Sequence, residues 1–205
     1  NVGSTAYTSA FNTTPNSFVI GQQLPSSYYL NALIGGIRIV NGYAVYTAPY
    51  FTPPTSAPTV IPGTVLLLTA STAYAYITDT GPLTLSWITR NGPVVWSSMS
   101  PYASITNGSS IYFNGINDNI AVYASSVNNF TLPTSNTPFT IEAWIYPVTT
   151  PNACSVITGA YYGSNDIPFA MGFDGYSLNS NGRWQSIGSG SNVFVGYYNQ
   201  GQSNA

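Results

Sequence analysis

Apolar and polar positions alternate, or apolar positions come in short runs, at many places along this chain. Eight such segments have the length of a β-strand, are rich in β-branched or aromatic residues, and are bounded by Gly, Pro, Asn or Asp. They span residues 17–21, 37–46, 64–69, 82–89, 110–115, 119–125, 139–148 and 192–198. No segment keeps apolar residues at helical spacing for more than two turns, so the pattern predicts an all-β protein. Strands that recur this often are typical of a sandwich or barrel.

The segment FTIEAWIYP, residues 139–147, shows the alternation most clearly. Side chains of a strand point to opposite faces in turn, so one face is apolar and consists of Phe139, Ile141, Ala143 and Ile145. The other face is mixed and consists of Thr140, Glu142, Trp144 and Tyr146. Because two aromatic residues flank a carboxylate, we interpret Glu142 as an acceptor of hydrogen bonds inside a sandwich. Binding of a ligand or metal by Glu142 is the alternative.

A proline-rich stretch interrupts the strand pattern between residues 47 and 63. Proline removes a backbone donor and fixes φ, so this stretch is neither helix nor central strand. The apolar run that follows it, residues 64–69, reads as a buried strand. The stretch is therefore either a loop inside one domain or a seam between two domains.

The strands after this stretch resemble a known family. The run SIYFNGINDNIAVYAS, followed by TPFTIEAWIYPV, is similar to the opening strands of the laminin-G-like, concanavalin-A-like jelly roll in its tandem-repeat form. The residues in register with the family pattern are Phe113, Gly115, Asp118, Phe139, Thr140, Glu142, Trp144 and Pro147. Asn114 replaces the first Asp of that pattern. The resemblance covers residues 64–147.

The beginning of the chain resembles the closing strands of the same family, including a Leu-Arg-Ile-like strand that contains Arg38. The resemblance thus implies closing strands in residues 1–56, a Pro-rich seam at 57–63 and opening strands in 64–205. The implied fold is an antiparallel jelly-roll sandwich that is permuted, or that is completed by a neighbouring copy in a longer array. We expect the neighbour to complete it, because a stiff proline-rich connector resists folding back.

The composition excludes several classes of function. Only 4% of residues are charged, the net charge is −2, there is no histidine, and about a third of the chain is Ser, Thr or Asn. Nucleic-acid binding needs clustered cations, and the three arginines are far apart in sequence. Without histidine, neither a Ser-His-Asp triad nor a His-containing zinc site can form. The five acidic residues show no paired pattern, so we expect no enzymatic activity.

Three Asn-X-Ser/Thr acceptors, at Asn12, Asn107 and Asn129, predict N-linked glycans if the protein is exported. Glycans would suit a surface that has almost no charge, so we expect an extracellular location or the surface of a cell or virion. No apolar run reaches the ~18 residues of a membrane span. The single Cys154 excludes an internal disulfide and is either a small buried residue or a reactive or intermolecular thiol.

The resemblance also implies a calcium site at a sandwich rim, for which Asp118 is the candidate, with Asn117 and Asp174 as further oxygen donors. Gly35 and Gly36 stand where the family often has paired acids, so such a site would lack charge. The alternative is that Asp118 caps its own turn. We therefore expect no required cofactor and no need of metal for folding.

Two functions fit these observations. The first is a structural repeat unit of an extracellular, glycosylated filament, fibre or surface array that assembles with copies of itself through strand pairing and interface burial. In this function Arg38, Glu142 and Trp144 have structural roles. The second is a carbohydrate-binding, lectin-like adhesion module, because a sandwich rich in Tyr and Trp could present aromatic rings to sugars.

Overall fold

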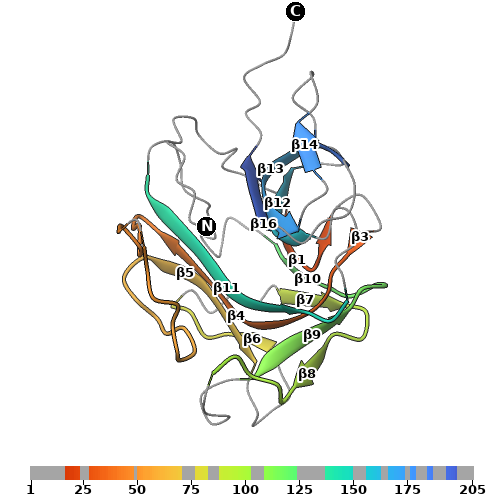
Figure 1. The fold of residues 1–205 in the computed structure, drawn as a ribbon, viewed down its shortest axis with the longest axis horizontal. Helices are drawn as coiled ribbons and strands as arrows, with labels where there is room; N and C mark the ends of the chain where they lie inside the picture. The colour runs from red at the N-terminus through yellow and green to blue at the C-terminus, as the bar shows by residue number, and fades with distance from the viewer. Residues whose placement is uncertain are drawn as a thin grey trace, which may run out of the picture.

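The computed structural model describes residues 17–23, 28–48, 50–70, 77–82, 88–102, 109–123, 137–149, 156–162, 166–173, 176–178, 184–186 and 193–197. All regular secondary structure in these ranges is β, as Figure 1 shows, which confirms the predicted all-β class. No helix long and apolar enough to cross a membrane occurs in the described ranges.

Two six-stranded antiparallel sheets contain most of the strands. The first sheet has the order β16 (Val193–Tyr197), β13 (Asp166–Phe173), β12 (Val156–Tyr162), β1 (Ser17–Ile20), β10 (Asn119–Val122) and β7 (Ile88–Asn91). The second has the order β6 (Ile77–Asp79), β5 (Thr64–Ala70), β4 (Asn31–Asn41), β9 (Ser110–Asn114) and β8 (Val95–Ser97), with β11 (Phe139–Pro147) also paired to β4. Two short hairpins complete the described strands: β2 (Gln22–Gln23) with β3 (Tyr28–Tyr29), and β14 (Tyr176–Leu178) with β15 (Trp184–Ser186).

Two strands that precede the proline-rich stretch, β1 and β4, lie in the interior of the two large sheets. β1 lies between β10 and β12. β4 pairs with β11 along one edge and with β5 and β9, one after the other, along its opposite edge. The strands before and after the proline-rich stretch thus pair within one chain, which favours a fold completed by the chain itself over the expected completion by a neighbouring copy. This pairing is compatible with a β-sandwich formed by a single chain.

β4 has a β-bulge at Gly35 and Gly36, between the part that pairs with β9 and the part that pairs with β5. Ile34 lies opposite Ile145, whereas Ile37 lies opposite Ala143, so β4 has one residue more than β11 between these pairs. Gly36 has a φ of 109°, which is accessible to glycine but strained for other residues. The extra residue turns both Ile34 and Ile37 to the core although they are three positions apart.

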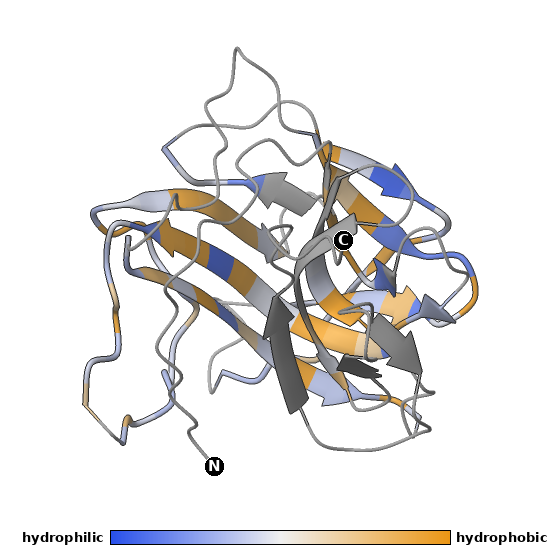
Figure 2. Ribbon diagram, turned by 90° about the horizontal axis from the view of Figure 1, so that it is seen from above, coloured by the Kyte–Doolittle hydropathy of each residue, from blue (hydrophilic) through white to orange (hydrophobic). Residues whose placement is uncertain are grey.

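One hydrophobic core joins the two sheets, as in a β-sandwich. Its fully buried side chains come from both of them and include Phe18, Ile20, Ile34, Ile37, Ile39, Leu66, Leu68, Ile111, Phe113, Ile120 and Ile157. Figure 2 shows hydrophobic residues along the strands, while the described loops are largely pale or hydrophilic. The predicted apolar face of β11 is confirmed, because Phe139, Ile141, Ala143 and Ile145 all pack against this core.

Candidate functional site

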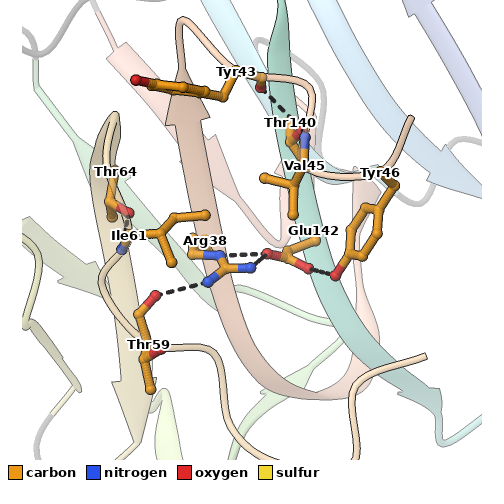
Figure 3. A network of polar contacts seen from close by, with 9 residues as sticks. All are labelled: Arg38, Tyr43, Val45, Tyr46, Thr59, Ile61, Thr64, Thr140 and Glu142. Carbon is orange, nitrogen blue, oxygen red and sulfur yellow. Dashed lines mark hydrogen bonds and ion pairs between the residues drawn. The ribbon is translucent and has the colours of Figure 1, made fainter. Parts of the chain in front are cut away.

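A polar network covers the outer face of the second sheet, at the end where β4 and β11 meet the proline-rich segment (Figure 3). Arg38 and Glu142 lie directly opposite each other on these two strands, so their side chains share a face. The Arg38 guanidinium donates to the Glu142 carboxylate and forms an ion pair with it. The same guanidinium donates through Nη1 to the Thr59 carbonyl at 2.7 Å. The Tyr46 hydroxyl donates to the other Glu142 oxygen.

The network is largely shielded from water, since only 9% of the Arg38 side chain and 15% of the Glu142 side chain are exposed. Burial, followed by the hydrogen bond to Glu142, raises the pKa of Tyr46 from 10.0 to about 12. This hydroxyl therefore stays protonated and keeps donating at any physiological pH. Glu142 accordingly lies in a fully partnered ion pair rather than open to a ligand.

The network fastens the segment of residues 43–61, which we call the clamped segment, to the second sheet. Besides the bonds of Tyr46 and Thr59, the segment makes two backbone hydrogen bonds to the Thr140 side chain on β11. Thr140 Oγ1 accepts from the Val45 amide at 2.9 Å and donates to the Tyr43 carbonyl. Thr64 Oγ1 accepts from the Ile61 amide at 2.9 Å. The proline-rich stretch therefore follows the surface of its own sandwich and is held at several points.

The second predicted site, Asp118, lies in the turn between β9 and β10. Its side chain is completely buried, and its Oδ2 accepts from the Asn114 amide at 2.8 Å. Its Oδ1 has no hydrogen-bond partner among the residues that the structure describes. The turn itself is capped by Asn114, whose Oδ1 accepts from the amides of Ile116 and Asn117 at 2.8 and 3.1 Å. Asp118 thus bonds the backbone of its own turn, and Asn114, which the sequence hypothesis did not name, forms the other side-chain bonds of that turn.

The described surroundings of Asp118 do not form a recognisable calcium site. Calcium takes 6–8 oxygen ligands, and no group of three acidic, His or Cys side chains occurs among the residues that the structure describes. Gly92, with a φ of 74°, lies beside the free oxygen, and a side chain there would not fit: a Cβ would lie 2.4 Å from Asp118 Oδ1 and 2.5 Å from the Asn117 carbonyl oxygen. Burial raises the pKa of Asp118 above its ordinary value, because it disfavours the charged carboxylate.

A third feature of the outer face is a row of apolar side chains across four strands. Directly opposite residues share a face, and the register places Val95, Tyr112, Leu33 and Tyr146 in one row. Leu33 lies between the core residues Ala32 and Ile34 in the sequence, so the row points away from the core. Tyr146 is 60% exposed and Val95 is 48% exposed. We call these four residues the apolar row.

A pocket of about 280 Å³ adjoins the apolar row. It is lined by Leu33, Gly35, Met99, Ser100, Pro101, Ser110, Trp144, Ile145 and Tyr146. Tyr102 holds its wall in place, because its hydroxyl donates to the Gly35 carbonyl at 2.8 Å and its ring meets the edge of Trp144 at 6.5 Å. Burial, followed by the nearby charge of Glu142, raises the pKa of Tyr102 to about 12. Sequence reasoning gave Trp144 a structural role and did not predict this pocket.

Several predicted residues lie outside the described residues: the glycosylation acceptors Asn12, Asn107 and Asn129, the single Cys154, and Asp174. Of the predicted structural residues, Arg38 and Glu142 come together in the polar network, and Trp144 lies in the pocket wall on the same strand as Glu142. Asp118 lies apart from them, in a turn between the two sheets.

Comparisons with protein-family models, with curated proteins and with solved structures give no match for this chain. The laminin-G-like resemblance of the sequence therefore stays a prediction, and the candidate functions rest on the chemistry of the sites themselves.

Proposed function

We propose that this chain is a non-enzymatic structural building block of an extracellular, glycosylated assembly, in which copies meet through the clamped segment. One observation carries the proposal: this segment is fixed to the sheet by the polar network, yet it exposes apolar side chains. They are Tyr43 at 55%, Tyr50 at 85%, Phe51 at 44% and Val60 at 49% exposure.

Exposed apolar side chains that gather on one segment are typical of an interaction surface. Aromatic residues are also enriched where proteins meet. The Phe51 ring lies 4.5 Å from the Tyr46 ring, and Tyr46 in turn is bonded to Glu142. This support and the prolines reduce the entropy that the segment would lose on binding, which favours association.

The low charge of the chain supports the same proposal. With eight charged residues in 205, copies repel one another very little. We place the contact between copies on the clamped segment rather than on exchanged strands, because β1 and β4 already have partners on both edges within the chain. Glycans on Asn12, Asn107 or Asn129 would then keep other surfaces apart.

Sedimentation velocity over a wide concentration range, with electron microscopy of the concentrated sample, tests this proposal. The wild-type protein is expected to self-associate, and Tyr50→Ser to weaken the association at least about tenfold, as at an interface hot spot. Ile116→Ser is the matched control, because Ile116 is 74% exposed in the turn that contains Asp118. A wild-type protein that stays monomeric, or equal weakening by both substitutions, would contradict the proposal.

A further inference from the structure

Beyond this assembly role, we infer that the apolar row and its pocket form a binding site for a neutral glycan. One sugar ring would occupy the pocket beside Trp144 and Tyr146, and the rest of the saccharide would lie along the row. The inference rests on the shape, the hydrogen-bonding groups and the charge of this surface.

The shape suits a saccharide because one face of a pyranose ring presents mainly C–H groups, which pack on aromatic and aliphatic surfaces. Tyr112 and Tyr146 lie on strands separated by β4, so they are about 10 Å apart across the sheet. This spacing is comparable to the length of a disaccharide. Leu33 between them continues the flat surface at the level of the sheet, since it is only 8% exposed.

The pocket supplies the polar groups that sugar hydroxyls require. Ser100 Oγ accepts from the Tyr102 amide at 3.1 Å, which leaves its own proton to donate. Ser110 Oγ donates to the Met99 carbonyl, which leaves its lone pairs to accept. Ser100 can therefore donate a hydrogen bond to a sugar hydroxyl, and Ser110 can accept one.

The charge of the surface selects a neutral ligand. None of the residues of the row or the pocket is charged. The acid nearest to them on β11, Glu142, is neutralised by Arg38. A sialylated or sulfated sugar, or an acidic peptide, would find no cation here to offset the loss of its hydration.

The size of the surface argues against a second copy as its occupant. A standard protein interface uses roughly 20–30 residues on each side, and the row and pocket together have far fewer. The pocket also lies just below the range of roughly 300–1,000 Å³ that is typical of drug-sized ligands. A single sugar ring fits this volume better than a folded partner does.

The test measures binding of the whole protein to immobilised neutral hexasaccharides of glucose, mannose and N-acetylglucosamine, with sialylated and sulfated sugars beside them. We expect selective binding to at least one neutral series. Tyr146→Ala is expected to lower the affinity at least about tenfold with an unchanged melting temperature, because it removes the most exposed aromatic platform. Tyr28→Ala, at a tyrosine 42% exposed on β3, is the matched control and is expected to bind like wild type.

The inference is overturned if no neutral sugar binds, if only the anionic sugars bind, or if Tyr146→Ala binds as tightly as wild type. Tyr50→Ser separates this inference from the proposed assembly, because the substitution lies on the clamped segment and is expected to leave the affinity of the isolated protein for sugar intact. Loss of sugar binding in Tyr50→Ser would also contradict the assignment to the apolar row.

Discussion

Arg38 and Glu142 are two of only eight charged residues in the chain, and they are bound to each other. A chain that uses so little charge places this pair where three segments meet: β4, β11 and the clamped segment. The pair alone does not guarantee stability, because removing two charges from water costs about as much as their attraction returns. Its value lies in the bonds to Tyr46 and Thr59, which set the position of the segment.

The first prediction concerns the loss of one partner of this pair. Glu142→Gln leaves the Arg38 guanidinium without a counter-charge in a site that is largely shielded. We expect the free energy of unfolding to fall by about 2–3 kcal/mol, between the values typical of surface and of buried pairs. Denaturant unfolding measures it, with the neutral double variant Arg38→Met/Glu142→Leu as the control. If Glu142→Gln costs less than about 0.5 kcal/mol, the pair acts as an ordinary surface contact.

The second prediction concerns Asp118, whose folded-state pKa is raised above its ordinary value of 3.8 by burial. The folded protein holds this proton more tightly than the unfolded chain does. The contribution of Asp118 is therefore fully present below pH 3.8 and is lost as the pH rises through the folded-state pKa. The side chain of the Asp118→Asn variant is neutral at every pH.

We therefore expect Asp118→Asn to melt a few degrees higher than wild type at pH 7 and to lose this advantage at low pH. Thermal unfolding of both proteins from pH 3 to 8, with and without a calcium chelator, makes the comparison. Chelation is expected to change neither melting curve. A wild-type protein that loses stability on chelation, or a variant less stable at pH 7, would show that Asp118 acts as a charged ligand.

At the scale of elements, the alternation of apolar and polar positions predicted the strands well where no glycine or proline interrupted it. The segments at 64–69, 110–115 and 139–148 correspond closely to β5, β9 and β11. The segment at 37–46 was placed less well, because β4 begins at Asn31 and ends at Asn41. Gly35 and Gly36 read as a break but form a bulge, and Gly42, with a φ of 89°, ends the strand where the apolar pattern continues.

Other strands were not predicted at all. β12 contains Gly159 and Ala160, and β13 contains Pro168 and Gly172, so neither shows a clean alternation. They form strands because each pairs with a neighbour inside the first sheet. The apolar row could not be predicted from the sequence either, because its four residues come from four strands and only the pairing register places them side by side.

The third prediction compares two glycines with positive φ. At Gly92 a Cβ would meet Asp118 and Asn117 within 2.5 Å, whereas at Gly42 it would meet nothing within 4 Å. Gly42→Ala is expected to cost only backbone strain, about 1 kcal/mol. Gly92→Ala is expected to cost about 2–4 kcal/mol, because the clash adds to the strain. Equal costs in denaturant unfolding would mean that the connection from β7 to β8 does not pack against the Asp118 turn.

For the whole molecule, the sequence indicated the order of the strands but not their partners. The order that the resemblance implies, with closing strands before opening strands, is compatible with pairing inside one chain and with pairing between copies. The proline-rich stretch suggested a stiff spacer, but Arg38, Thr140 and Thr64 hold it against its own sheet. Because this connection lies along the sheet, β4 can pair with β11 on one edge and with β5 and β9 on the other edge, all in the same chain.

The fourth prediction tests this central claim through an engineered disulfide. Val40 on β4 lies directly opposite Thr140 on β11, and both residues are close to cysteine in size. Facing residues of an antiparallel pair lie within the range of Cα separations that a disulfide spans. The variant is Val40→Cys/Thr140→Cys with Cys154→Ser, and each single-cysteine variant in the same background is a control.

Oxidation of this variant at low concentration, followed by intact-mass measurement and non-reducing electrophoresis, is the most direct measurement. If β4 and β11 of the same chain are neighbours, the protein stays at the mass of one chain, loses both free thiols and melts at a higher temperature. If the two strands belong to different copies, oxidation yields covalent dimers and larger polymers, and the self-contained sandwich is contradicted.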